Sequence, residues 1–214
     1  MNFAIFSPQA TRVELLLYEA ADSLHPFQTV TLDPDTNRTY FSWHVLVEGL
    51  APGAHYAWRL DGPSDTATSG RRFNPRKTLV DPFAHAVSDR LWDRRRAADP
   101  ADDSPGGFRA VVSDDRFDWG GERALARGLE GAVIYELHVG GFTRHPSSRV
   151  HAPGTFRALC ERIPYLLELG ITHVELLPVM AFDEQSVPRE VAARGLKNYW
   201  GYNTHSFRSP HPAY

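Results

Sequence analysis

The most constraining feature of the sequence is a change in hydrophobic pattern near Gly131. Beyond it, two short apolar runs at 132–139 and 171–179 flank a segment, 155–169, whose apolar residues recur at helical spacing. Apolar runs of this length are typical of strands buried in a parallel sheet. The order strand, helix, strand therefore predicts a parallel βαβ unit with a right-handed connection. Pro164 lies inside the helical segment and predicts a kink or a break into two shorter helices.

The first third of the chain has a different pattern, with short β-branched and aromatic runs between Gly, Pro and Asp turns. These runs predict the strands of an antiparallel Ig-like β-sandwich. They lie at 13–18, 27–32, 40–47 and 55–60. The stretch 97–131 is rich in Asp, Gly, Pro and Ala, which is typical of a connector. We therefore predict a β-sandwich over 1–96, a connector over 97–131 and a second domain over 132–214.

Composition and charge argue against several classes of function. The chain has 23 basic and 26 acidic residues, so it lacks the basic footprint of a nucleic-acid-binding protein. The run Asp93 to Arg96 is interpreted as a solvated surface rather than an anion site. No apolar run approaches the roughly 20 residues that span a bilayer, so no membrane partner is expected. With one cysteine, Cys160, and no export pattern in the first residues, we expect a cytoplasmic location.

Ionisable side chains on the predicted strands and loops are candidates for chemistry. Glu136 and Glu175 lie inside the two apolar runs, and paired carboxylates can hydrolyse glycosides, but a structural role in the strands is favoured. His138 is interpreted as a hydrogen-bonded strand histidine that could also line a pocket. His205 and His211 lie in a Pro-rich loop without helical spacing or a nearby acid, so no metal site is expected. The sequence has no phosphate-cradling glycine loop, and no cofactor is expected.

The stretch 197–207 carries the clearest signal for ligand binding. It interleaves Tyr199, Trp200 and Tyr202 with a glycine and with amides such as that of Asn203. Sugar rings pack their C–H groups on aromatic faces while their hydroxyls meet amide groups. In a (β/α) barrel, a loop after the second parallel strand lies at the face where sites form. An aromatic plug that caps the barrel is the alternative interpretation.

Three segments in this order resemble the opening of the catalytic barrel of isoamylase-type glycogen debranching enzymes, within the α-amylase superfamily. They are VIYELHVGGFT at 133–143, LGITHVELLPV at 169–179 and NYWGYN at 198–203. Upstream segments are also similar to that family. They are NFAIFS at 2–7, DGP at 61–63, RFNP at 72–75, LVDPFA at 79–84 and FDWGG at 117–121. The resemblance covers nearly the whole chain.

The resemblance implies a β-sandwich of the family 48 carbohydrate-binding-module type, followed by the first βα units of a truncated (β/α)8 TIM barrel. It implies a retaining hydrolase of α-1,6 branch linkages, with glycogen, limit dextrin or a related α-glucan as partner. Tyr202 matches the family tyrosine that stacks on the sugar at the cleaved linkage, and Tyr199, Trp200 and Asn203 match its loop. The family's catalytic carboxylates come from later barrel strands. We therefore expect no catalytic residue before Tyr214 and no hydrolysis by this chain alone.

Two other functions remain open at this point. The chain could be a non-catalytic α-glucan-binding module, with aromatic residues such as Trp43, Tyr56 and Trp58 holding polysaccharide, or a scaffold that packs against an enzyme barrel. For the tryptophans, burial in the sandwich core is favoured over sugar contact. The sequence predicts neither the oligomeric state nor the exact glucan.

Overall fold

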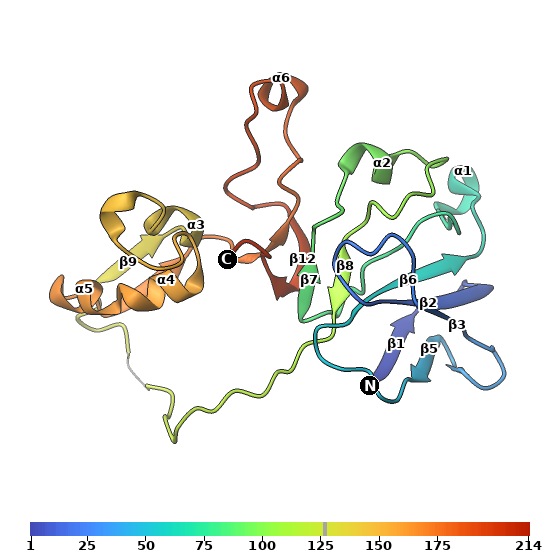
Figure 1. Ribbon diagram of the computed structural model, residues 1–214, viewed down its shortest axis with the longest axis horizontal. Coiled ribbons are helices and arrows are strands. Elements are labelled where there is room, and N and C mark those ends of the chain that lie inside the picture. The colour runs from blue at the N-terminus through green and yellow to red at the C-terminus, as the bar shows by residue number, and fades with distance from the viewer. Residues whose placement is uncertain (126–127) are drawn as a thin grey trace.

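The computed structural model describes residues 1–125 and 128–214, which form two parts joined by an extended segment (Figure 1). Residues 126 and 127, in the predicted connector, lie outside the described residues. The first part is a sandwich of two antiparallel sheets. One sheet has the order β3 (Gln28–Thr31), β2 (Arg12–Tyr18), β6 (His55–Asp61), β8 (Arg109–Val111) and β7 (Ala86–Ser88). The other has the order β1 (Asn2–Phe6), β5 (Ser42–Leu46) and β4 (Arg38–Thr39).

The space between the two sheets holds the main hydrophobic core. Alternation along β2 points Val13, Leu15 and Leu17 into this core, where Trp43 and Trp58 are 1% and 0% exposed. The indole N–H of Trp58 donates to Asp81 Oδ2 at 3.2 Å, so its polar edge is satisfied inside the core. The predicted burial of both tryptophans is confirmed, which removes them as exposed sugar platforms. Tyr56, 8% exposed, is removed in the same way.

The opposite face of β2 carries a buried ion pair. Glu14 is 4% exposed and accepts hydrogen bonds from Arg59 Nε at 2.6 Å and from Arg12. Burial alone would raise the pKa of Glu14, but the hydrogen bond and charge of Arg59, together with Arg12, lower the pKa below its usual value. The folded state therefore favours the ionised carboxylate.

Replacing Glu14 with glutamine is expected to reduce the free energy of unfolding at pH 7 by about 1 to 2 kcal/mol, because its partially screened charge-assisted pairs with Arg59 and Arg12 are both lost. Since the folded pKa is depressed, this stabilisation is present above the unfolded value of 4.5 and is lost as the pH falls through the folded pKa. Urea titrations of both proteins from pH 7 down to pH 3 measure the difference. A difference that does not shrink on acidification would contradict this assignment.

One strand of the sandwich comes from the segment predicted as a connector. β8 pairs with both β6 and β7, and its Arg109 lies 3.7 Å above the Tyr18 ring. The Arg109 guanidinium also donates to the carbonyl of Ser23 at 2.6 Å. A three-residue strand among Gly, Pro and Asp residues carries no periodic signal, so its place depends on these long-range partners. The short helices α1 (Thr66–Ser69) and α2 (Arg94–Ala98) lie on the excursions before β8.

The second part contains the parallel strand pair predicted from the apolar runs. β9 (Ile134–Leu137) and β10 (His173–Leu176) pair in parallel, with Glu136 opposite Glu175. The connection contains α3 (Val139–Phe142), a 3-10 turn (Pro146–Ser148), α4 (Phe156–Glu161) and α5 (Ile163–Glu168). The predicted break occurs at Arg162, and Pro164 lies in the first turn of α5, where its missing N–H costs nothing.

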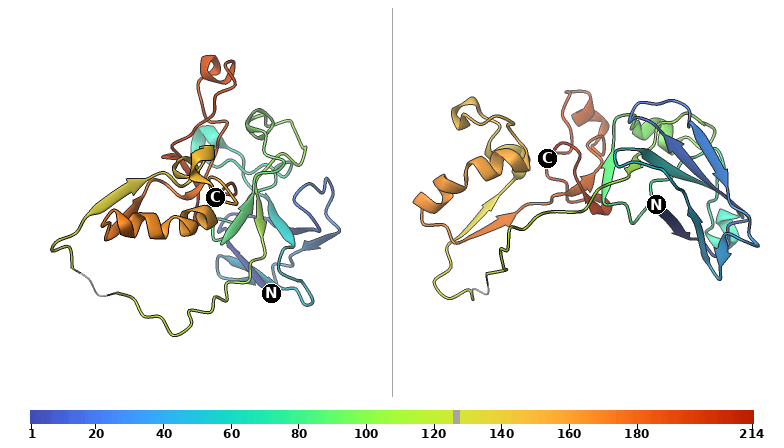
Figure 2. Two further views of the ribbon diagram at one scale, coloured as in Figure 1. Left: turned by 60° about the vertical axis from the view of Figure 1, so that its left-hand side comes forward. Right: turned by 60° about the horizontal axis from the view of Figure 1, so that its bottom comes forward.

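A further two-stranded sheet lies between the two parts (Figure 2). β11 (Met180–Phe182) pairs antiparallel with β12 (Thr204–Pro210), and α6 (Arg189–Ala192) lies on the excursion between them. Ser209 of β12 donates to the carbonyl of Ala84, beside β7, at 2.5 Å. His205, predicted in a loop, lies in β12, so that prediction is wrong: pairing with β11 extends a segment whose sequence reads as irregular. Among the described residues, no helix is long and apolar enough to cross a membrane.

Candidate functional site

A cleft of about 810 Å³ lies at the carboxyl end of β9. It is formed by residues of β9 and α3, by Leu177 after β10, and by the aromatic segment that precedes β12. The lining residues are Tyr135, Glu136, Leu137, His138, Gly141, Phe142, Leu177, Tyr199, Trp200 and Tyr202. We refer to this site as the aromatic cleft.

His138 is fixed in the wall of the aromatic cleft by contacts on both sides of its ring. It precedes α3, and its Nδ1 accepts the Gly141 N–H at 3.1 Å, so the ring caps the helix. The proton then belongs on Nε2, which lies 2.8 Å from the carbonyl oxygen of Tyr199 and 3.2 Å from the Tyr214 hydroxyl. These partners, rather than an observed hydrogen, assign the tautomer. His138 is hydrogen-bonded and part of a pocket wall, as interpreted, but it lies one residue beyond β9 rather than in the strand.

The aromatic rings of the cleft pack both face to face and edge to face. Tyr199 stacks on His138 with ring centroids 4.1 Å apart and planes 8° apart. Trp200 meets Tyr199 edge to face at 5.2 Å and 80°. Trp200 and Tyr202 are 55% and 73% exposed, unlike the buried tryptophans of the sandwich. Exposed aromatic faces of this kind are available to a ligand with an apolar face.

Asn203 lies outside the lining of the aromatic cleft and holds the loop instead. Its side-chain oxygen accepts from Asn198 Nδ2 at 2.6 Å, and the same Nδ2 is 3.3 Å from the carbonyl oxygen of Asp183. Between them, Gly201 has φ +73°, and an added Cβ would lie 2.6 Å from the Phe182 ring. Only glycine therefore allows the loop to pass this close to β11.

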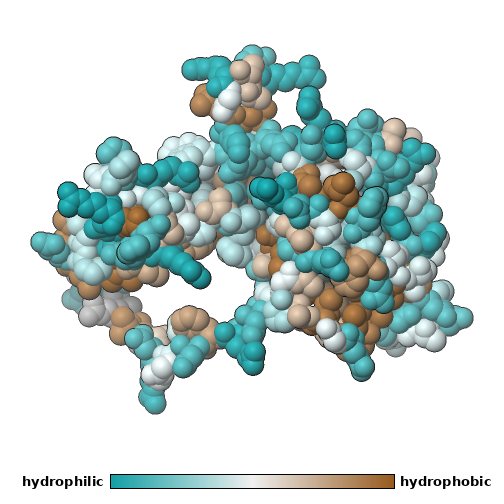
Figure 3. Space-filling model, viewed as in Figure 1, coloured by the Kyte–Doolittle hydropathy of each residue, from teal (hydrophilic) through white to brown (hydrophobic). Residues whose placement is uncertain are grey.

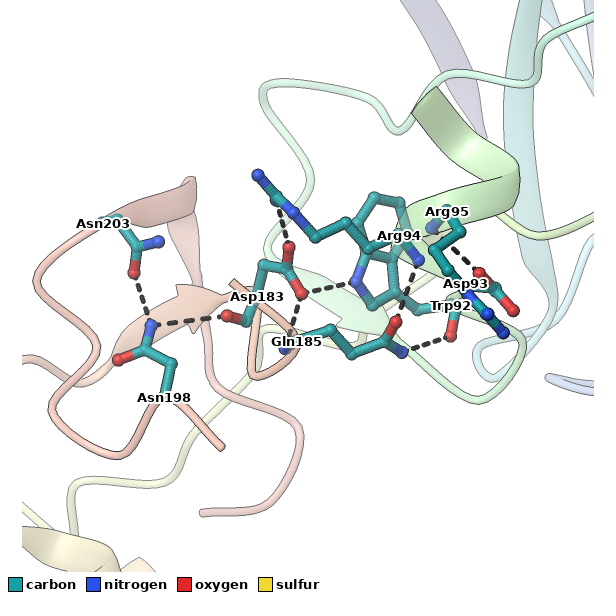
Figure 4. A network of polar contacts seen from close by, with 8 residues as sticks. All are labelled: Trp92, Asp93, Arg94, Arg95, Asp183, Gln185, Asn198 and Asn203. Carbon is teal, nitrogen blue, oxygen red and sulfur yellow. Dashed lines mark hydrogen bonds and ion pairs between the residues drawn. The ribbon is translucent and has the colours of Figure 1, made fainter. Parts of the chain in front are cut away.

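A polar network connects this loop to the excursion that carries α2 (Figure 4). The buried Asp183 carboxylate accepts from the Trp92 indole N–H at 2.6 Å and from Arg94 Nη1 at 2.5 Å. Gln185 completes it, because its side chain accepts from the Arg94 backbone N–H at 2.9 Å and donates to the Trp92 carbonyl at 2.7 Å. We call Trp92, Arg94, Asp183 and Gln185 the Asp183 network. Arg94 is therefore an ion-pair partner, which differs from the interpretation of its run as solvated surface.

The structure separates the other ionisable candidates. Glu136 lines the aromatic cleft, whereas Glu175, its in-register neighbour, does not, and both are exposed. His205 stacks on Phe108 at 4.3 Å, and burial lowers the pKa of His205. His211 is 2% exposed and packs 4.1 Å from the Phe182 ring, and burial lowers its pKa as well.

Sequence reasoning missed the residues that support the site. These are Gly141, Asp183, Asn198 and Tyr214. The signal that could have identified Gly141 is the pair of glycines directly after a predicted strand, since glycine marks a close approach of backbone and side chain. Asp183 has no such local signal, because its partners lie 89 and 91 residues away.

The N-terminal sandwich is similar to a known class of domain. Residues 1–84 match the family model described as carbohydrate-binding module 48, the isoamylase N-terminal domain. Over nearly its whole length the chain is similar to a glycogen debranching enzyme of Dickeya chrysanthemi, with 38% identity over 213 residues. The match covers 95% of this chain and 31% of that enzyme, so the chain spans about a third of its relative's length. The predicted resemblance to the N-terminal portion of glycogen debranching enzymes is confirmed.

Solved structures share this fold. A pullulanase of Paenibacillus barengoltzii, crystallised with maltotriose, matches with a TM-score of 0.70 and 23% identity. The pneumococcal SpuA, described as a multi-modular glycogen-degrading virulence factor, matches with a TM-score of 0.71 and 23% identity. Each match covers 100% of this chain, and it covers 31% of the pullulanase chain and 22% of SpuA. At this identity the similarity concerns the fold.

Proposed function

We propose that the chain is the N-terminal portion of an isoamylase-type glycoside hydrolase that cleaves α-1,6 branch linkages of glycogen or a related α-glucan. The observation that carries this proposal is the 38% identity to a glycogen debranching enzyme over 213 residues. The aromatic cleft supports it, because three of the four residues predicted to contact substrate, Tyr199, Trp200 and Tyr202, line one cavity.

The proposed architecture is a sandwich over 1–96, a connector over 97–131 that also supplies β8 to the sandwich, and the opening of a TIM barrel over 132–214. Support comes from the parallel pairing of β9 and β10 and from their uncovered apolar surface. Around α5 and β9, at the left of Figure 3, apolar residues gather on the surface. Exposed members include Ile134, Ile163, Leu167, Val174 and Leu176. Further strands and helices of a barrel would cover such a surface. The proposed location is the cytoplasm, in keeping with the single cysteine.

Within the aromatic cleft we assign Tyr202 to stacking on the sugar ring, with Tyr199 and Trp200 beside it and Asn203 holding the loop. Glu136 and Glu175 do not suit the chemistry of glycoside hydrolysis. Retaining enzymes place two carboxyl groups on either side of the scissile bond. Here the two glutamates are side by side on neighbouring strands, and only Glu136 lines the cleft. The chain alone is therefore expected to be inactive.

The first test is an assay of reducing-end release from glycogen, run beside glycogen co-sedimentation on the same protein. We expect binding without hydrolysis. Tyr202→Ala should weaken binding about tenfold, since stacking on an exposed ring is worth about 1 kcal/mol or more. Tyr40→Ala is the matched control, because Tyr40 is 90% exposed on the sandwich, far from the cleft residues in sequence. Hydrolysis by the 214-residue chain would contradict the assignment of Glu136 and Glu175.

A second candidate function is that of a non-catalytic α-glucan-binding module or scaffold. It is favoured by the match of residues 1–84 to a carbohydrate-binding module. The same assay separates the two proposals. Glycogen binding that persists unchanged in Tyr202→Ala would assign binding to the sandwich, whereas no binding by any variant would favour the scaffold.

A further inference from the structure

A second cavity, of about 670 Å³, lies on the sandwich side of the molecule. Its walls come from β1, from the loop between α1 and β7, from the α2 excursion and from His205 of β12. It shares no lining residue with the aromatic cleft. Most of the wall is apolar or aromatic, with contributions from Leu60, Phe73, Val80, Trp92 and Phe108. We call it the sandwich cavity.

Aromatic rings on one wall of the sandwich cavity form a packed group. Trp92 lies 4.9 Å from Phe108, and His205 stacks on Phe108 at 4.3 Å with planes 23° apart. Because Trp92 is held by Asp183 and Phe108 is buried in the sandwich, these rings are fixed rather than free to rotate. A fixed aromatic wall is suited to a flat apolar group.

The charged residues that line the sandwich cavity are all cations. They are Arg72, Lys77 and Arg96, and no Asp or Glu is among the described lining residues. Lys77 Nζ donates to the Arg96 carbonyl at 2.7 Å, which holds one cation beside the other. This arrangement is notable in a chain whose net charge is −3. Fixed cations at the edge of an apolar cavity favour an anionic ligand group.

Two carboxylates approach these cations from outside the cavity. Asp93 lies 3.9 Å from Arg96 Nε. Hydrogen bonds to Ser104 lower the pKa of Asp102, and the nearby charges of Lys77 and Arg96 lower it further. They therefore offset part of the charge of Lys77 and Arg96. Arg72, an exposed lining residue of the same loop as Lys77, is left as the cation most available to a ligand.

We propose that the sandwich cavity binds an amphipathic organic anion, with a flat apolar body against the Trp92 and Phe108 wall and a carboxylate or phosphate group at Arg72. A neutral glucan fits this cavity less well, because its many hydroxyls would face an apolar wall and the cations would gain no partner. This site is independent of the proposed debranching function.

The test compares two probes with the same ring system, the anionic naphthalene-2-carboxylate and the neutral naphthalene-2-carboxamide, titrated calorimetrically into the 214-residue chain. The carboxylate is expected to bind at least about tenfold more tightly, and added salt should reduce the difference. Arg72→Gln should abolish the difference. Arg71→Gln is the matched control, because Arg71 is exposed next in sequence but does not line the cavity.

A variant that fills the sandwich cavity tests whether the probes bind there. Ala97 lines the sandwich cavity, and Ala97→Trp should block both probes while thermal melting shows that the protein remains folded. Four outcomes would overturn the proposal: no binding of the carboxylate at millimolar concentration, equal binding of the two probes, equal effects of the two arginine variants, or binding that survives Ala97→Trp. Displacement of the probe by maltotriose would also overturn it, because the cavity would then take a neutral sugar.

Discussion

Asp183→Ala is expected to lower the free energy of unfolding by about 2 to 3 kcal/mol and to loosen the aromatic loop from the sandwich. The substitution removes the acceptor for the Trp92 indole N–H and for Arg94, at 2.6 and 2.5 Å. Trp92 is partly buried, so its N–H loses a hydrogen bond that water only partly replaces. Arg94 is 53% exposed and regains hydration in the variant, so the loss of its ion pair contributes little to the loss in the free energy of unfolding. Urea denaturation at pH 7 measures the loss.

A charge-matched control separates burial from charge. Asp114 also pairs with an arginine, Arg116, at 2.6 Å, but Asp114 is 39% exposed and Arg116 is 91% exposed. Asp114→Ala should leave the urea midpoint almost unchanged, because exposed ion pairs contribute little to stability. Asp183→Asn keeps one acceptor for Trp92, so its loss of stability should lie between those of Asp183→Ala and Asp114→Ala. In Asp183→Ala the Trp92 indole N–H should also exchange with solvent faster, and unchanged exchange would show that Asp183 does not hold the indole.

Local patterns were sufficient to predict β2, β3, β5 and β6 of the sandwich and the parallel pair, whereas β1, with its alternating burial, was not among the predicted strands. The predicted run 55–60 corresponds to β6 at His55–Asp61, and the break near Pro164 is present. The run 40–47 was predicted too long, because Tyr40, at φ +54°, forms the turn before β5 begins at Ser42. A left-handed tyrosine has no local sequence signal, since the hairpin imposes it.

Three of the strands that were not predicted share one physical cause. β7, β8 and β11 have three residues each, too few for periodicity to appear. Their hydrogen bonds come from partners selected by the tertiary fold, as when β8 pairs with His55 and Tyr56 on one side and with β7 on the other. Such strands can be placed only after the sheet that receives them is known.

The residues of the candidate site likewise fall into those that local sequence predicts and those that depend on long-range contacts. Its aromatic residues could be predicted, because exposed rings beside amides are recognisable in a short stretch of sequence. The supporting residues could not, because His138 and Tyr199 are 61 residues apart and Asp183 and Trp92 are 91 apart. Composition identifies the surface that meets a ligand, while the geometry of that surface depends on long-range contacts.

Gly141→Ala is expected to displace Tyr199 and to weaken glucan binding at the aromatic cleft by tenfold or more. A Cβ at this position would lie 2.1 Å from the Tyr199 hydroxyl oxygen. Gly141 lies in α3 without a positive φ, so alanine strains no backbone and even favours the helix. The whole conflict therefore falls on Tyr199, whose ring must leave its stack on His138. Quenching of tryptophan fluorescence by maltohexaose measures the affinity.

A double mutant decides whether the clash is the cause. Tyr199→Phe removes the hydroxyl oxygen, and the next ring atom, Cζ, would then lie 3.5 Å from the new Cβ, an ordinary contact distance. The Gly141→Ala/Tyr199→Phe protein should regain most of the affinity, while Tyr199→Phe alone should bind nearly as the parent does, because stacking on His138 needs the ring and not the hydroxyl. Weak binding in the double mutant, with strong binding in Tyr199→Phe, would mean that Gly141 acts through the His138 cap of α3 rather than through the tyrosine.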